Sequence, residues 1–179
     1  MTAFLPVTTD RLVLRPYVSS DRAEFHAVYS RPEVARFLLE EPWTEHVAEQ
    51  KVAERSEQTC LNGPGGTLAL VVDLEGRAIG NVMLWFTDRE HGVAEIGWVL
   101  DPTFGGRGYG AEAVRAVLNL AFDHYRIHRV AAQMDGRNTA SARLAKNVGM
   151  RHEAHLRQDW WSKGEWTDTV IFGTLASDR

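Results

Sequence analysis

The sequence of 179 residues has little cysteine, no long apolar run and no excess of positive charge. Cys60 is its only cysteine, which excludes an internal disulfide framework and a cysteine-based zinc site. The 20 Lys and Arg residues against 24 Asp and Glu give a net charge of −4, so no broad basic surface for nucleic acid is expected. No apolar stretch approaches the ~20 residues that span a membrane, and the first residues do not have the pattern of a signal peptide. We therefore expect a cytoplasmic protein with neither a membrane nor a nucleic-acid partner.

The composition that remains is that of an ordinary globular protein. Apolar residues make up 44% of the chain and charged residues 25%, close to average globular usage. A chain of this length buries enough apolar surface to fold without disulfides or metals. We therefore expect a single domain that spans residues 1–179.

The first third of the sequence predicts one strand followed by helices. The alternation in RLVLRP indicates a half-buried strand over 11–16. Capping residues and apolar spacing then predict helices over 19–30, 32–40 and 44–60.

The periodicity changes after the loop NGPGG at 62–66. Three apolar runs separated by turn residues, at 67–73, 78–87 and 93–100, predict consecutive antiparallel strands. The elements expected after them are a helix at 110–125, a strand at 128–135, a helix at 138–149, and strands at 151–161 and 166–175. This order indicates an α+β (mixed α/β) fold, with a central mixed, mostly antiparallel sheet of about six to seven strands flanked by about four helices.

The most informative segment is AEIGWVLDPTFGGRGYGAEAV, residues 94–114. Its glycines Gly105, Gly106, Gly108 and Gly110 fall between an expected strand and an expected helix. Glycines let the backbone approach a ligand closely, and the free N–H groups of a helix N-terminus favour a phosphate. A loop that only turned a corner would need fewer glycines, because each one costs backbone entropy.

Two nucleotide-binding motifs fit this segment poorly. A nucleoside triphosphate loop needs Lys-Ser or Lys-Thr after its glycines, and none follows here. A dinucleotide-binding turn needs GxGxxA, which Gly106, Gly108 and Ala111 supply, and an acid such as Asp135 at the end of the next strand. However, the glycines of a dinucleotide-binding turn follow their strand directly, whereas residues 101–104 intervene here. Such a turn also opens a doubly wound domain, whereas this one comes after an antiparallel meander. An NAD(P)-dependent oxidoreductase therefore stays as a secondary hypothesis.

The same segment resembles the acyl-CoA-binding core of the GNAT N-acetyltransferase superfamily, whose signature is (Gln/Arg)-x-x-Gly-x-(Gly/Ala). Gly108-Tyr109-Gly110 matches the second half, whereas Gly105 stands where the family has Gln or Arg. TDRLVLRP near the start and NTASARLAKNVGM near the end follow the order and spacing of the RimJ/RimL-type branch. The resemblance covers nearly the whole chain. It implies a GNAT fold and an N-acetyltransferase that moves an acetyl group from acetyl-CoA directly to a primary amine.

The resemblance also implies which residues bind acetyl-CoA. The strand at 93–100 would splay away from the strand at 128–135, and the pantetheine arm would pair with main-chain groups in the gap. The pyrophosphate would meet N–H groups of the glycine-rich turn beside Arg107, unless Arg107 is only a solvated loop charge. The expected acetyl-CoA-binding residues are Trp98, Val99, Leu100, Gly105, Gly106, Arg107, Gly108, Tyr109, Gly110, Ala111, Asn138 and Ser141.

Two residues are expected to be catalytic. Glu95 lies mid-strand between apolar neighbours, which raise the pKa of a carboxylate, and relatives place a general base at this position. Many relatives also have a tyrosine where Ala145 stands, so Ser141, which matches a serine of RimL-type relatives, is the expected proton donor to the departing thiolate. The alternatives are a solvent-facing Glu95, a surface Ser141 with water as the donor, and an Asn138 that only caps its helix.

Neither a covalent enzyme intermediate nor a metal is expected. Cys60 lies outside every motif, which agrees with direct transfer. His124 and His128 are four residues apart, but no third ligand accompanies them.

The acceptor groove is expected between the early helices (18–45) and the final hairpin (155–170). Aromatic and acidic side chains there could hold a cationic amine, or the tryptophans could be core or a dimer surface, which leaves a homodimer open. The residues in question are Trp43, Trp160, Trp161, Trp166, Glu40, Glu41 and Asp159. The expected partner is a small-molecule or peptide/protein amine of undetermined identity. A non-catalytic acyl-CoA-binding sensor of the same fold is the alternative function.

Overall fold

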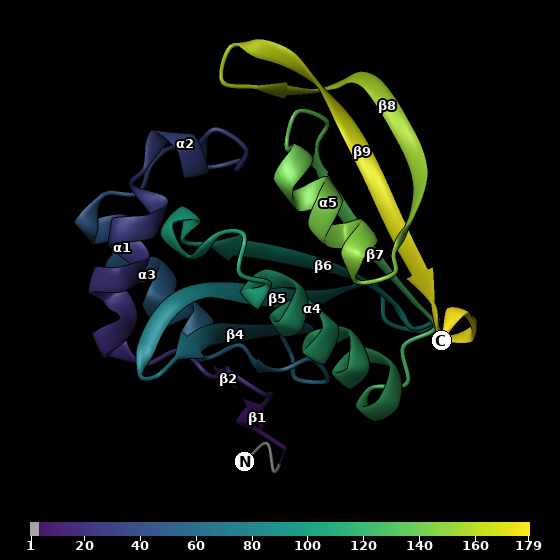
Figure 1. Cartoon of the computed structure of the whole chain (residues 1–179), viewed down its shortest axis with the longest axis horizontal. Helices are drawn as coiled ribbons and strands as arrows, with labels where there is room; N and C mark the ends of the chain where they lie inside the picture. Colours follow the sequence, from purple (N-terminus) through teal and green to yellow (C-terminus); the bar gives the residue numbers. More distant parts are fainter. Residues whose placement is uncertain (1–3) are drawn as a thin grey trace.

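The computed structural model describes residues 4–179 and contains one nine-stranded sheet (Figure 1). The strands follow the order β1-β2-β4-β5-β6-β7-β9-β8, and β3 pairs with β4 at the side of this path. Their bounds are β1 Val7–Thr8, β2 Val13–Arg15, β3 Thr59–Cys60, β4 Thr67–Leu74, β5 Arg77–Asp88, β6 Val93–Leu100, β7 Arg129–Asp135, β8 Arg151–Ser162 and β9 Glu165–Leu175.

Five α-helices accompany this sheet in the described part of the chain. They are α1 Arg22–Tyr29, α2 Pro32–Ala35, α3 Glu45–Ser56, α4 Tyr109–Asn119 and α5 Thr139–Asn147. A π-helical turn, Leu120–His124, continues α4. Within residues 4–179 no helix is long and apolar enough to cross a membrane.

The expected α+β fold with a mixed, mostly antiparallel sheet is confirmed. Strands β4, β5 and β6 form the predicted antiparallel meander, and β8 and β9 form the closing hairpin. The pair β6–β7 is parallel, whereas the other strand pairs of the described sheet are antiparallel. The crossover between β6 and β7 runs through the glycine-rich turn and α4, which places that turn at the end of β6.

Two apolar cores lie on the two faces of the sheet, as the alternation along β4 shows. Leu68, Leu70 and Val72 belong to the core that includes α4, while Ala69 and Val71 belong to the core that includes α1 and α3. In Figure 1, α1 and α3 accordingly lie together, away from α4 and α5. Because successive strand residues point to opposite faces, one strand supplies both cores.

The structure differs from the sequence prediction at the ends of two helices and at two strands. The helix expected over 32–40 ends at Ala35, and the one expected over 44–60 ends at Ser56. The latter stops because Thr59 and Cys60 pair with β4 as strand β3. Strand β1, which pairs with β2, was also not predicted, so the sheet has two short strands more than expected.

Candidate active site

A gap opens between the two parallel strands in the middle of the sheet. Strands β6 and β7 pair only at their beginnings, and Glu95 opposite Ala131 is the last paired register. Strand β6 continues to Leu100 and β7 to Asp135 without further pairing. The backbone groups of β6 that face β7 beyond Glu95 therefore have no strand partner, which is the splay that the resemblance implied.

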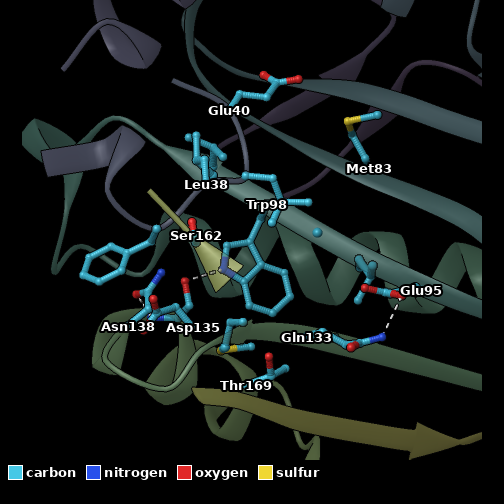
Figure 2. A pocket seen from close by; sticks show the side chains of 18 of the residues that line it. Leu38, Glu40, Met83, Glu95, Trp98, Gln133, Asp135, Asn138, Ser162 and Thr169 are labelled. Carbon is cyan, nitrogen blue, oxygen red and sulfur yellow. Dashed lines mark hydrogen bonds between the residues drawn. The ribbon is translucent and has the colours of Figure 1, made fainter. Parts of the chain in front are cut away.

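A cavity of about 530 Å³ occupies this gap and extends over one face of the sheet (Figure 2). Its volume lies within the range of small-molecule sites. Three directly opposed pairs of β5 and β6 residues form its floor: Asn81 and Val99, Met83 and Gly97, and Trp85 and Glu95. Tyr29 of α1, Arg55 of α3, the loop after α2 and the β8–β9 hairpin supply the walls.

Glu95 lies at the floor of this cavity and is half-buried. Its Oε2 accepts a hydrogen bond of 3.2 Å from Nε2 of Gln133, a residue of β7 (Figure 2). Burial raises the pKa of Glu95 above its usual value, although the hydrogen bond from Gln133 works in the opposite direction. The side chain is therefore a carboxylate of enhanced basicity that faces the cavity, at the vertex of the gap.

Ser141 lies across the gap, in the first turn of α5. Its Oγ accepts a hydrogen bond of 3.3 Å from the indole Nε1 of Trp98, so its own hydroxyl proton is free to donate. Asn138 caps the helix, because its Oδ1 accepts a hydrogen bond of 3.1 Å from the Ser141 N–H. Both side chains line the cavity, and Asn138 does so in addition to its capping role. Ala145 is fully buried in the core and supplies no polar group.

The glycine-rich turn connects β6 to α4. Pro102–Phe104 form a 3-10 turn, and Gly105, which brings no side chain to the loop, donates its N–H to the Pro102 carbonyl at 2.9 Å. Gly108 is the N-cap of α4 with φ of +83°, a conformation that disfavours any residue with a side chain. At Gly110 a Cβ would lie 2.7 Å from Cδ1 of Leu144, so a side chain there would force this leucine to move. Glycine at this position therefore lets α4 pack closely against α5.

Three residues outside the turn fix its position. Glu112 in the first turn of α4 accepts hydrogen bonds from the Thr9 hydroxyl at 2.6 Å and from the Arg11 Nε at 2.7 Å. The Arg11 guanidinium also donates to the Arg107 carbonyl at 3.0 Å and lies over the Tyr109 ring. The TDRL segment of the sequence therefore anchors the glycine-rich turn. The Arg107 side chain itself is exposed.

The tryptophans expected at the acceptor groove separate into three groups. Trp43 is 3% exposed and stacks on Tyr29, so its interpretation as a core residue is correct. Trp160 lines the cavity. Trp161 and Trp166 pack edge-to-face against each other on the exposed part of the hairpin and are not among the cavity-lining residues.

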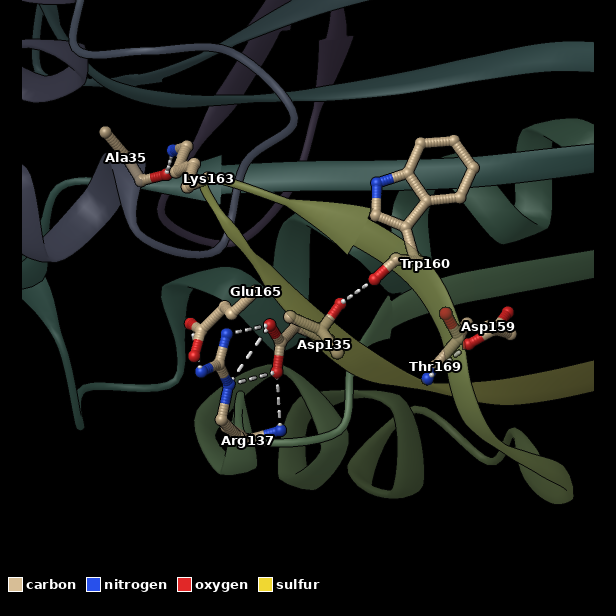
Figure 3. A network of polar contacts seen from close by, with 9 residues as sticks. Ala35, Asp135, Arg137, Asp159, Trp160, Lys163, Glu165 and Thr169 are labelled. Atoms are coloured by element: carbon tan, nitrogen blue, oxygen red, sulfur yellow. Dashed lines mark hydrogen bonds and ion pairs between the residues drawn. The ribbon is translucent and has the colours of Figure 1, made fainter.

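Of the expected acids, only Glu40 faces the cavity. Asp159 instead accepts a hydrogen bond from the Thr169 N–H within the hairpin (Figure 3).

The tip of the β8–β9 hairpin contacts the loop after α2 and so covers part of the cavity. The Lys163 ammonium donates to the Ala35 carbonyl (Figure 3). It also donates to the Glu40 carbonyl at 2.8 Å. At the base of the same tip, Arg137 pairs with Asp135 and Glu165, at 2.7 Å in each case. The cavity is therefore roofed by segments that are far apart in the sequence.

Sequence reasoning missed several residues of the site. Gln133 could have been found, because pairing Glu95 with Ala131 places it next to Glu95 on the same face of the parallel neighbour. Arg55 and Asn81 gave no such signal. Their approach depends on how α3 packs across the sheet, which no local pattern contains.

Comparison with known proteins explains this arrangement. The family model described as an acetyltransferase (GNAT) domain matches residues 11–151. The chain belongs to the GNAT acetyltransferase family. The expected GNAT fold is thereby confirmed, and the chain is an acyltransferase of this family rather than an NAD(P)-dependent oxidoreductase.

Individual GNAT relatives match over nearly their whole length. The uncharacterized N-acetyltransferase YnaD of Bacillus subtilis is 27% identical over 172 residues, which cover 96% of this chain and 98% of YnaD. A GNAT acetyltransferase from Bacillus anthracis superposes with a TM-score of 0.87 at 26% identity, covering 97% of this chain and 99% of that one. RimL, a ribosomal-protein alpha-N-acetyltransferase, shares the fold with a TM-score of 0.81 at 18% identity, over 97% and 98% of the two chains. These matches are consistent with the RimJ/RimL-type branch that the sequence resembles.

Proposed function

We propose that this chain transfers an acetyl group from acetyl-CoA to a primary amine in one step, without an acyl-enzyme. The observation that carries the proposal is that one cavity contains a basic carboxylate, Glu95, and a hydroxyl with a free proton, Ser141, on the two sides of an open parallel strand pair. Cys60 lies in β3 and not among the cavity-lining residues, which supports direct transfer.

The residues of the gap fit acetyl-CoA. The free edge of β6, Trp98 to Leu100, offers backbone groups to the pantetheine amides, and Asn138 offers its side-chain amide from the other side. The first N–H groups of α4 are open to a pyrophosphate at the glycine-rich turn, where Arg107 adds a positive charge. Acetyl-CoA supplies the thioester whose acetyl group is transferred.

The two polar side chains then serve the two proton movements of the reaction. Glu95 accepts a proton from the amine, so that the nitrogen lone pair is available to form the new C–N bond. Ser141 donates its hydroxyl proton to the sulfur as the C–S bond breaks, and it is held for this by the Trp98 indole. The second proton that the nitrogen loses as the amide forms can return to Ser141 through water, because the cavity is open to solvent.

The acceptor class is a primary amine, either a small molecule or a protein N-terminus. Fold neighbours include a Vibrio cholerae spermidine N-acetyltransferase bound to CoA and spermine, as well as RimL. These two neighbours represent both kinds of acceptor.

Thermal unfolding with acetyl-CoA, CoA and NADPH in parallel tests the proposal first. A ligand at ~100 times its Kd should stabilise the protein by about 2.7 kcal/mol, a rise in Tm of several degrees. We expect such a rise with the two CoA species only, followed by release of free thiol in an amine screen. No stabilisation by either CoA species, or stabilisation by NADPH alone, would contradict the proposal.

A further inference from the structure

The charged side chains of the cavity are not equally free to bind a substrate. The carboxylate of Asp135 is already paired with the Arg137 guanidinium at 2.7 Å. The carboxylate of Glu40 is paired with the Lys51 ammonium at 3.1 Å and accepts a hydrogen bond of 2.6 Å from the Trp43 indole. Among the carboxylates that line the cavity, this leaves Glu95 without a cation in the described part of the chain.

Arg55 of the cavity wall, in contrast to Asp135 and Glu40, has no ion-pair partner in the described part of the chain. Its guanidinium lies among the rings of Tyr17, Tyr29 and Trp43, at 5.8, 5.3 and 5.0 Å from their centroids. One nitrogen, Nη1, donates to the hydroxyls of Tyr17 and Tyr29, both at 3.3 Å. Across residues 4–179 no carboxylate forms an ion pair with Arg55, and its other N–H groups have no hydrogen-bond partner.

Arg55 lines the cavity, and its unpartnered N–H groups are not fully enclosed, so they are open to a ligand. A largely buried cation without an ion-pair partner is costly unless a ligand supplies the negative charge, and the nearby Glu40 carboxylate is already paired with Lys51. The planar guanidinium fork fits a carboxylate with two parallel hydrogen bonds.

The strands place this cation at the end of the cavity away from the proposed base. The Tyr29 hydroxyl, which contacts Arg55, donates to Oδ1 of Asn81 at 2.7 Å. Asn81 is directly opposite Val99, and Val99 is four residues beyond Glu95 on the same face of β6. Four residues of a strand span about 13 Å. A molecule that reaches both groups is therefore extended.

From this geometry we infer that the acceptor is an extended primary amine with a carboxylate at its far end, and that Arg55 binds this carboxylate while the amine lies at Glu95. The inference rests on the proposed function. A polyamine is disfavoured, because the two other acids of the cavity wall are already neutralised. An ω-amino acid and a short peptide with an acidic third residue both have the required chemistry.

The test compares acids with their amides. The probes are ω-aminooctanoate and its primary amide, the C-terminally amidated peptides Ala-Ala-Glu and Ala-Ala-Gln, of which only the first carries a carboxylate, and spermidine. In thiol release with acetyl-CoA we expect kcat/KM to favour the acid by at least tenfold in one or both pairs, mainly through KM. The pair with the larger preference for the acid shows whether the acceptor is a small amino acid or a peptide. Equal values within both pairs, or a preference for spermidine, would overturn the inference.

Substitutions of Arg55 test whether this residue causes the preference for the acid. In Arg55→Gln we expect the preference for the acid to disappear, with KM for the amide nearly unchanged, and in Arg55→Lys we expect partial retention. Arg22→Gln, which removes an exposed cation outside the cavity, should keep the preference. A preference for the acid that persists in Arg55→Gln would contradict the role of Arg55. If Arg55→Gln does not fold, the Arg55→Lys variant and the wild-type comparison decide.

Failure of the proposed function is distinguishable from failure of this inference. Calorimetric titration of the CoA-bound wild type with each acid and amide measures the preference without turnover. Absence of CoA binding or of thiol release with every amine contradicts the proposed function. Equal binding of acid and amide to the CoA-bound protein contradicts the inference alone.

Discussion

At the scale of single residues, the proposed chemistry depends on side chains with few partners. Glu95 has one amide donor, Gln133, and no neighbouring cation among residues 4–179, so burial dominates its pKa. Ser141 accepts one hydrogen bond, from Trp98, and keeps its proton. Partners that were stronger, such as an arginine beside Glu95, would lower the basicity on which proton removal depends.

Replacing Glu95 tests this at the level of turnover. Glu95→Gln should lower kcat by about 10²–10⁴, because the side chain can no longer accept a proton. The wild-type rate should rise with pH through the raised pKa of Glu95, and the variant should lose this rise. Glu90→Gln, at an exposed position in the β5–β6 turn, is the matched control. A loss below about threefold, with unchanged acetyl-CoA binding, would remove Glu95 from the mechanism.

The same substitution should increase stability at alkaline pH. Because the pKa of Glu95 is higher in the folded than in the unfolded chain, its favourable contribution is full below the ordinary value of ~4.3 and is lost as pH rises through the folded pKa. Glu95→Gln lacks this loss. In urea unfolding we expect the variant to exceed the wild type near pH 8 and to match it near pH 4. A variant that is less stable at both pH values would show that the carboxylate is well compensated in the fold.

At the scale of elements, α4 depends on the N-terminal segment for the position of its first turn. Thr9 and Arg11 both bind Glu112, and Arg11 reaches across to the Arg107 carbonyl. The N–H groups proposed to meet the pyrophosphate belong to this turn. Its position is therefore set by residues about 100 positions earlier, as the separation of 101 between Arg11 and Glu112 shows.

Removing Arg11 should loosen the turn and weaken CoA binding. Arg11→Met loses charge-assisted hydrogen bonds to Glu112 and Arg107, at a cost of about 1 kcal/mol or about fivefold in the Kd for CoA. Calorimetric titration with CoA measures this. Arg22→Met, which breaks the exposed 3.6 Å pair with Glu49, should leave the Kd unchanged. Equal Kd values for wild type and Arg11→Met would mean that the turn holds its shape alone.

Most elements were predictable because their signals are local. The β4–β6 meander follows from apolar runs between turn residues, and α5 from the Asn138 cap and the glycine after its end. The errors lie where tertiary contacts override local preference. The segment after Ala35 leaves the helix and lines the cavity, and its carbonyls at Ala35 and Glu40 bind Lys163 from the hairpin tip.

The candidate site was predictable only in part. Glu95, Ser141 and Asn138 were found through motifs, and the structure brings all three to one cavity. Arg55 was not found, since its sequence surroundings are those of an ordinary amphipathic helix. Its significance arises from the three rings around it and from the absence of an ion-pair partner in the described chain.

At the scale of the whole molecule, the acceptor side of the cavity closes through a contact between distant segments. Lys163 at the tip of the hairpin lies 128 residues from Ala35, whose carbonyl it binds. The two segments contribute Trp160 and Leu38 to the cavity wall. The acceptor side therefore depends on side-chain hydrogen bonds between distant segments, whereas the two strands that flank the gap belong to one sheet.

Breaking this contact should affect the amine and not the co-substrate. Lys163→Met removes the donor to both carbonyls, so we expect KM for the amine to rise about threefold to tenfold with the Kd for CoA unchanged. Steady-state kinetics with varied amine, together with CoA titration, measure the two effects. Lys146→Met, on the exposed surface near the end of α5, is the control. A rise in the Kd for CoA would show that the hairpin tip supports the donor side instead.

The end of pairing between β6 and β7 also places Glu95 where the distance between the two strands is fixed by hydrogen bonds. Beyond the Glu95–Ala131 register the two strands of the described sheet are held only by their outer neighbours, β6 by β5 and β7 by β9, so the distance between them is fixed at the Glu95 end and least constrained at the far ends. Glu95 belongs to the last joined register, whereas Leu100 and Asp135 are at the far ends. A change in the width of the gap would therefore displace the groups at Leu100 and Asp135 far more than the Glu95 carboxylate.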